Sequence, residues 1–295
     1  MSEAVSSPPA ASRPAQSELW KGVRRLLREP LGVFGLTLVL LVIFGAVFAD
    51  LLTGWDPTRI NPRDRFLDPS GAHLLGTDQL GRDLFARVLH GGRIALYVAL
   101  VSTAISLAIG IVLGLIAGYG PRWLDNLMIL VFDATKSFPT VMLALALVTI
   151  VGPSLTAVIV VVIIVNVPGY ARIIRTQTIA IKTSEFVTAA QSMGASNARI
   201  LRVHIMPNVI GPLVILASMD IPVVIAIEAG MSFLGLGVRP PTPSWGSILN
   251  DGFSQIRDTP WIAIAGGLPI IVTTLGFTFL GETLRDVFDP RLKGR

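Results

Sequence analysis

The chain has 295 residues, of which 52% are hydrophobic and 15% charged, and its mean hydropathy is +0.68. Soluble proteins carry about 25% charged residues, so this composition excludes a disordered chain and argues against a soluble enzyme. Cysteine is absent, which excludes disulfides and thiolate metal sites, and the three histidines lie far apart in the sequence. In so apolar a chain the net charge of +5 indicates basic loops on the cytoplasmic side of a membrane rather than a nucleic-acid partner.

A Ser-, Pro- and Ala-rich tail, residues 1–29, opens the chain and is predicted to be largely disordered. After it come six stretches with the length and apolar character of membrane-spanning helices, each of which needs about 20 residues. They predict an all-α, polytopic membrane protein with six transmembrane helices. The stretches are about 30–53, 94–119, 124–151, 154–171, 208–236 and 261–284.

Two of the predicted spans contain glycine or proline residues that affect helix packing or helix geometry. The second has Gly110, Gly114 and Gly118 on nearly one helix face, where another helix can approach closely. That helix could belong to the same subunit or to a neighbouring one. The third span contains Pro139, which removes a backbone hydrogen bond and predicts a fixed kink or a hinge.

Six spans place both termini on the same side of the membrane. Cytoplasmic termini leave 15 basic residues in cytoplasmic segments and eight in external ones, so the positive-inside rule favours this orientation. Arg82, Arg87 and Arg93 are then external. We expect them to lie at the membrane interface, partly offset by Asp78 and Asp83.

The sequence lacks the motifs of several enzyme classes. It has no Gly-Lys dipeptide, hence no phosphate-binding Walker A loop, and no H-E-x-x-H zinc motif. Ser232 is not in a nucleophile elbow, and no histidine lies within a predicted span to act as its base. We therefore expect no catalytic, cofactor-binding or metal site, and any energy from ATP must come from another chain.

A long polar stretch, residues 172–208, separates the fourth and fifth spans. Residues 184–185 resemble a helix start, Gly194 can end one short helix before the next, and residues 206–208 are expected to end the second helix and redirect the chain. Small residues at 189–190 permit close approach by a partner. The stretch therefore predicts a compact knob that fits a cleft of a soluble partner.

This stretch resembles the EAA loop of ABC importer permeases, whose pattern is E-A-A, three residues, Gly, and about ten residues to Leu-Pro. Thr188 replaces the family's Glu, and Glu185 lies one turn earlier as a substitute; Met206 replaces Leu. The resemblance implies that the knob docks an ATPase. The docking residues it implies are Glu185, Thr188, Ala189, Ala190, Gly194, Ala195, Pro207 and Asn208.

Residues 73–83, 228–246 and 281–292 resemble signatures of the second, C-type permease of dipeptide, oligopeptide and nickel importers. The resemblance covers about residues 20–293 and implies a type I ABC importer permease in a bacterial or archaeal inner membrane. It divides the chain into four parts: a cytoplasmic tail (1–29), a first helix with an external loop (30–92), a permease core (93–284) with its docking loop at about 173–207, and a cytoplasmic C-terminal segment (285–295).

The partners that the resemblance implies are a second homologous permease, two ABC ATPases that bind ATP and Mg, an extracytoplasmic binding protein and the lipid bilayer, without nucleic acid. The cargo it implies is a dipeptide or oligopeptide, with a nickel chelate, haem, glutathione or an opine-like compound as alternatives in the same family. A secondary transporter driven by an ion gradient is a remote rival, because we see no inverted repeat.

Polar residues within the spans are costly unless they face an interior or a watery cavity. Asp133 and Lys136 could pair with each other or mark the translocation pathway, and Glu228 could meet a peptide ammonium group or serve the structure. The Pro-rich external turn could contact the binding protein or rest on lipid headgroups. The pathway candidates are Asp133, Lys136, Asp220, Glu228 and Ser232, and the external candidates are Arg239, Pro243 and Trp245.

Overall fold

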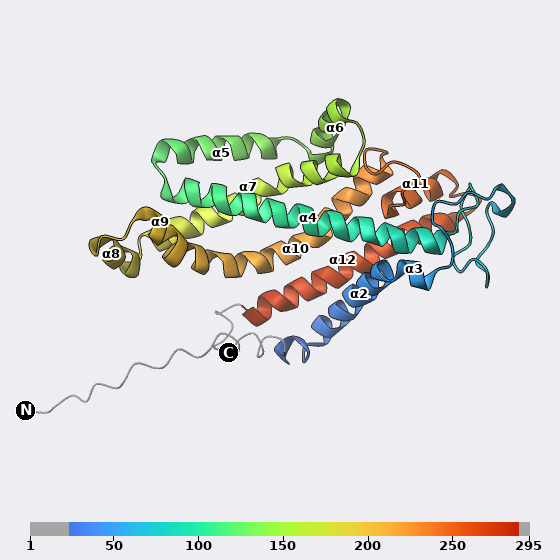
Figure 1. The fold of residues 1–295 in the computed structure, drawn as a ribbon, viewed down its shortest axis with the longest axis horizontal. Helices are drawn as coiled ribbons and strands as arrows, with labels where there is room; N and C mark the ends of the chain where they lie inside the picture. The colour runs from blue at the N-terminus through green and yellow to red at the C-terminus, as the bar shows by residue number, and fades with distance from the viewer. Residues whose placement is uncertain (1–23, 289–295) are drawn as a thin grey trace, which may run out of the picture.

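The computed structural model describes residues 24–288, which form an elongated bundle of helices (Figure 1). Within this range one isolated antiparallel bridge, between Thr77 and Asp83, is the only strand-like pairing. The all-α prediction is confirmed. Most of the predicted tail, residues 1–23, and the last seven residues of the C-terminal segment, 289–295, lie outside the described residues.

Five helices of the described chain are long and apolar enough to cross a membrane, and a bent pair, α5 and α6, makes a sixth span if it is counted as one. The helices of the bundle are α2 (Pro30–Val47), α4 (Leu84–Tyr119), α5 (Arg122–Ser137), α6 (Thr140–Val151), α7 (Leu155–Lys182), α10 (Met206–Phe233) and α12 (Pro260–Phe288). The short elements are α3 (Ala49–Leu52), η1 (Pro62–Asp64), α8 (Glu185–Ser192), α9 (Asn197–Arg199), η2 (Ile200–Ile205) and α11 (Trp245–Ser254).

Two helices are longer than the sequence predicts. α4 begins at Leu84, because the Asp83 carboxylate caps it by accepting a hydrogen bond from the backbone N–H of Ala86 at 2.7 Å. α7 continues to Lys182, eleven residues beyond the predicted end of its span. The 36 residues of α4 rise about 54 Å, against about 30 Å for a hydrocarbon core, so polar turns of the same helices extend beyond the bilayer.

The third predicted span is not one helix. It breaks at Phe138 and Pro139, and α5 and α6 meet at 91°. Phe138 has extended backbone angles, as expected of a residue before proline. The predicted kink is confirmed, and it turns α6 steeply away from the direction of α5 (Figure 1).

The glycine stripe of α4 packs against α7 of the same chain. A Cβ atom on Gly114 would lie 2.6 Å from both the carbonyl oxygen of Ala171 and the Cβ of Ile174, and Gly110 and Gly118 meet α7 as closely. The structure therefore decides between the two readings of the stripe: it serves packing within one subunit.

The two ends of the bundle differ. One end carries α8, α9 and η2 together with both ends of the described chain, and the other carries α11 and the loop that follows α3 (Figure 1). Between them, the central core joins apolar side chains of α2, α4, α6, α7, α10 and α12.

Candidate functional site

The predicted docking knob consists of α8, α9 and η2, at one end of the bundle (Figure 1). Gly194 ends α8 with a φ of +81°, a left-handed conformation that glycine adopts without a steric penalty. The backbone N–H of Ala195 then donates to the carbonyl of Ala190 at 3.0 Å and closes the turn. The predicted helix break at Gly194 is confirmed.

The inner face of the knob is anchored on the bundle. Val187, Ile200 and Ile205 are buried in a cluster that includes residues of α7 and α10. The Tyr119 hydroxyl at the end of α4 hydrogen-bonds Asn197 Oδ1 at 2.8 Å. The knob is therefore in direct contact with α4, α7 and α10.

The outer face of the knob exposes large apolar side chains. Met193 is 82% exposed, and Phe186 and Val203 are also exposed. Exposed apolar side chains gathered at one place indicate a protein interaction site. The predicted docking residues on this surface are Glu185, Thr188, Ala189, Gly194 and, with partial exposure, Ala195.

Two predictions for the knob are wrong. Ala190 is buried against its own chain, so its small size serves internal packing and not the approach of a partner. The chain does not break at residues 206–208, because η2 continues directly into α10. Pro207 therefore lies inside a continuous helix, directly after the π-helical turn of η2, and the exposed Asn208 donates from its side chain to the His204 carbonyl at 2.6 Å.

Asp133 and Lys136 do not pair with each other. Asp133 forms an ion pair with Arg172 of α7, and Lys136 is exposed. A second pair joins Asp125 of α5 to Arg175, with an Nη2–Oδ2 distance of 2.7 Å. The sequence analysis missed these two arginines. No local pattern identifies them, because a pair between two helices depends on how those helices are arranged in space.

The remaining pathway candidates lie in α10. Asp220 is half-buried near Tyr170 of α7. Glu228 is fully buried at 0% exposure, and its Oε1 accepts a hydrogen bond from the buried Ser232 hydroxyl at 2.8 Å. Their own chain encloses both side chains, and a role of Glu228 and Ser232 on the pathway stays a prediction.

Of the three predicted external contacts, one is exposed and two are buried. Arg239 is exposed, whereas Pro243 is buried and Trp245 is 2% exposed. The Trp245 indole N–H donates to the carbonyl of Val88 at 2.8 Å, and its ring packs on glycines of α4. Pro243 and Trp245 therefore fasten α11 to α4, and they are not surface contacts.

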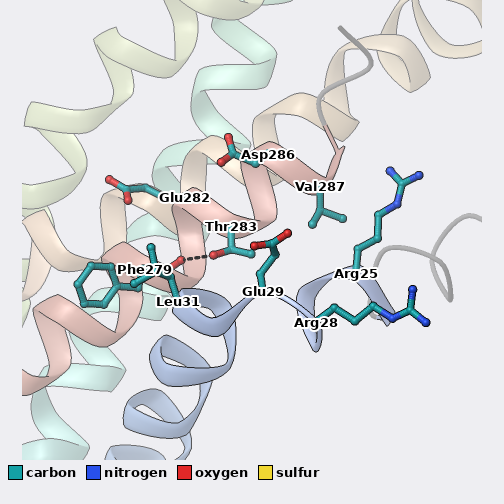
Figure 2. A pocket seen from close by; sticks show the side chains of 9 residues that line it. All are labelled: Arg25, Arg28, Glu29, Leu31, Phe279, Glu282, Thr283, Asp286 and Val287. Carbon is teal, nitrogen blue, oxygen red and sulfur yellow. Dashed lines mark hydrogen bonds between the residues drawn. The ribbon is translucent and has the colours of Figure 1, made fainter. Parts of the chain in front are cut away.

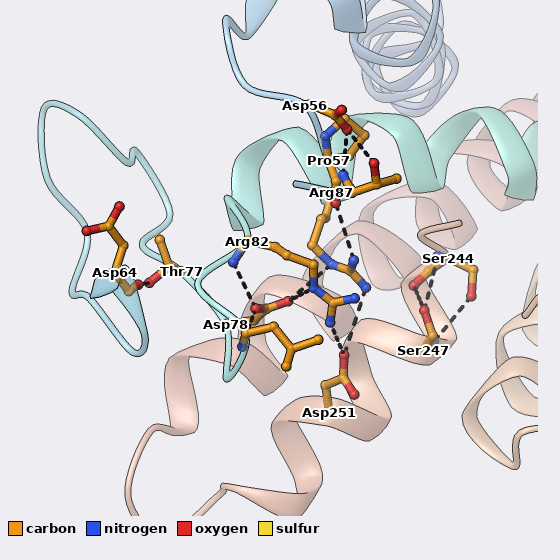
Figure 3. A network of polar contacts seen from close by, with 12 residues as sticks. Asp56, Pro57, Asp64, Thr77, Asp78, Arg82, Arg87, Ser244, Ser247 and Asp251 are labelled. Atoms are coloured by element: carbon orange, nitrogen blue, oxygen red, sulfur yellow. Dashed lines mark hydrogen bonds and ion pairs between the residues drawn. The ribbon is translucent and has the colours of Figure 1, made fainter. Parts of the chain in front are cut away.

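A charged network holds the opposite end of the bundle together (Figure 3). Asp78, which is fully buried, lies 2.6 Å from Arg82 Nε and 3.5 Å from Arg87 Nε. Asp251 of α11 lies 3.2 Å from Arg82 and 3.8 Å from Arg87. The expected compensation by Asp78 is confirmed, and Asp251, a residue distant in sequence, completes it. The network joins the loop before α4 to α11.

Asp83 was predicted to offset the charge of the nearby arginines, but its carboxylate pairs with a histidine instead. Besides capping α4, its carboxylate lies 2.8 Å from Nδ1 of His73, which stacks on Trp55. The third basic residue of this region, Arg93, reaches back to Asp50 of α3 at 2.7 Å. Hydrogen bonds from Arg93 and His90 hold the pKa of the Asp50 carboxyl below its usual range.

Comparison with known proteins agrees with this geometry. The family model described as the inner membrane component of binding-protein-dependent transport systems matches residues 110–294, and the model of the N-terminal transmembrane domain of oligopeptide transport permease C matches residues 18–69. The dipeptide transport permease DppC of Alkalihalophilus pseudofirmus is 38% identical over 99% of this chain and 96% of its own length.

The glutathione transport permease GsiD of Pectobacterium atrosepticum is 40% identical over 94% of this chain and 91% of its own length. A solved structure of the MetNI methionine ABC transporter in an inward-facing conformation has the same fold, with a TM-score of 0.53 and 19% identity over 69% of this chain and 97% of its own. The chain therefore belongs to the family of inner membrane components of binding-protein-dependent transport systems, as a multi-pass permease component of an ABC importer.

Proposed function

We propose that this chain is one of two homologous permeases that form the pathway of a peptide importer. Its relatives are named for the transport of dipeptides, peptides and glutathione, and glutathione is itself a modified tripeptide. An extracytoplasmic binding protein delivers the peptide to the end of the bundle that carries α11, where Arg239 is exposed. The chain performs no reaction of its own.

The exposed apolar face of the knob is the observation that carries the proposal. Phe186, Met193 and Val203 project from the end of the bundle where both described ends of the chain lie. An ATPase subunit that covers this face removes their apolar surface from water. ATP and Mg bind to two such ATPase partners, and this chain receives the motion through the knob.

The mechanism is a two-state change in access. Closure of the ATPases displaces the knob, and the buried cluster beneath it moves α7 and α10. The ion pairs of Asp133 with Arg172 and of Asp125 with Arg175 then carry α5 along with α7. With Lys136 exposed on the same helix, α5 presents charged groups to the pathway that the second permease completes.

Because the chain has no cysteine, one introduced cysteine gives an unambiguous cross-linking site. Met193→Cys, in membranes that contain the whole transporter, is expected to cross-link to an ATPase subunit, with a yield that changes when ATP is added. Leu51→Cys is a matched control, since Leu51 is also 82% exposed but lies at the opposite end of the bundle (Figure 1). Equal cross-linking of both variants to the ATPase would refute the docking assignment.

The cargo is tested through the partners. A pull-down in mild detergent is expected to recover a second permease, ATPases with Walker motifs and a binding protein, which is then screened against dipeptides, oligopeptides, glutathione, haem and nickel chelates. Preferential binding of haem or a nickel chelate would refute the peptide assignment and leave the importer role intact. Transport by this chain alone in liposomes under a proton gradient would refute the ATP-driven importer.

A further inference from the structure

A pocket with no role in the proposed transport mechanism lies between the start of α2 and the end of α12 (Figure 2). Its volume of about 370 Å³ is within the range of small-molecule sites. It lies where the apolar stretches of both helices give way to charged residues, which is the level of a membrane's headgroup region. A ligand in this pocket therefore meets both water and lipid.

The charges of the pocket form two poles. Arg25 and Arg28 belong to one turn, in which the Arg28 N–H donates to the Arg25 carbonyl at 2.9 Å. Glu282 and Asp286 lie four residues apart on one face of α12, across the opening (Figure 2). Like charges so spaced repel each other. Among the described residues, no ion pair within 4 Å joins one pole to the other, and Glu29 lies between them.

An apolar track leads from the pocket along the two helices. Leu31 and Phe279 line the pocket itself, and Leu31 is exposed. The ring of Phe34, also exposed, lies 6.0 Å from that of Phe279 and continues the track toward the middle of α2. The charged opening of the pocket is thus continuous with an exposed apolar surface of α2.

We propose that this pocket binds the headgroup of a zwitterionic phospholipid with a primary ammonium group, phosphatidylethanolamine. Its phosphate lies between Arg25 and Arg28, its ammonium donates hydrogen bonds to Glu282 and Asp286, and an acyl chain follows the apolar track. Arginine recognises phosphate through charge-assisted hydrogen bonds. A purely anionic headgroup leaves the acidic pole without a partner, and a choline headgroup has no N–H to donate.

The test uses the full chain in nanodiscs of phosphatidylethanolamine, phosphatidylglycerol and phosphatidylcholine in equal amounts. After extraction with mild detergent, mass spectrometry counts the lipids that remain bound. We expect phosphatidylethanolamine to be retained over the other two, and Arg25→Gln with Arg28→Gln to reduce its retention about tenfold, as the loss of one or two hydrogen bonds between charged groups implies. Arg24→Gln is the control, because Arg24 is exposed but does not line the pocket.

A second variant tests the acidic pole separately. Glu282→Gln with Asp286→Asn is expected to retain phosphatidylcholine as well as phosphatidylethanolamine, because the ammonium has lost its charged acceptors. All four substituted side chains are exposed, so helix content, measured by circular dichroism, is expected to remain unchanged.

Three results would overturn the proposal. The first is equal retention of phosphatidylethanolamine by the Arg25 and Arg28 variant and by the Arg24 control. The second is retention of phosphatidylglycerol or phosphatidylcholine by the unmodified chain as strongly as phosphatidylethanolamine. The third is displacement of the bound lipid by millimolar inorganic phosphate alone, which would make the basic pole a simple anion site.

Discussion

Replacing Gly114 with alanine tests the contact between α4 and α7 most directly. The new Cβ would lie 2.6 Å from the carbonyl oxygen of Ala171 and 2.6 Å from the Cβ of Ile174. Neither atom is the end of a flexible side chain, so relief requires the two helices to separate. Overpacking of this kind costs about 1–3 kcal/mol, against which alanine gains about 1 kcal/mol in helix propensity.

Gly169→Ala is the matched control, since Gly169 lies inside the membrane helix α7, is not followed by proline, and has none of the described residues outside its own helical backbone and chain neighbours within 4 Å of a Cβ placed there. It reports the propensity gain alone. The difference in free energy of unfolding between the two variants is therefore expected to be about 1–3 kcal/mol. Titration with SDS in mixed micelles, followed by the fluorescence of the five tryptophans, measures it. Equal stability of both variants would refute the close packing.

Two further changes test the ends of the bundle. Gly194→Val places a β-branched residue at a φ of +81°, a strain of about 1–2 kcal/mol confined to the knob, and is expected to leave membrane insertion intact while the ATPase no longer co-purifies and uptake is lost. Asp78→Asn removes the carboxylate between two buried arginines, and breaking a buried pair costs about 3–5 kcal/mol, which the same SDS titration measures.

Each of these changes has a control in the chain. Gly235 has a φ of +76° at the opposite end of the bundle, so Gly235→Val carries similar strain and is expected to keep the ATPase bound. Asp68 is exposed in the same external loop as Asp78, and Asp68→Asn is expected to be nearly neutral. Normal uptake by Gly194→Val, or equal stability of the two aspartate variants, would contradict the roles assigned to Gly194 and Asp78.

The positions of the membrane helices could be predicted because each span is a local property of about 20 apolar residues. The ends of the helices could not be read from hydropathy, since α4 and α7 continue as polar helix beyond the apolar stretch. Their lengths depend on local caps such as that of Asp83 and on packing against the knob. The sequence predicted a bend at Pro139 but not its size, because the 91° angle depends on where α6 packs.

Among the candidate site residues, the helix break at Gly194 followed from the sequence because a left-handed turn favours glycine. The sequence did not show which side chains face solvent and which face the core. Ala189 and Ala190 are adjacent and chemically identical, yet the first is exposed and the second buried. Trp245 is apolar enough for either a membrane interface or a core, and the glycines of α4 that receive its ring lie more than 150 residues earlier in the sequence.

The sequence alone determined that this is an all-α, multi-pass membrane protein with a polar, helical knob, because hydropathy, proline and glycine act over a few residues at a time. Only the tertiary structure decided which charges meet. Asp133 could have paired with Lys136 on its own helix, but α7 brings Arg172 to it, and Asp78 shares its arginines with Asp251. Pairing between distant residues depends on how helices are arranged in space, and no local pattern specifies that arrangement.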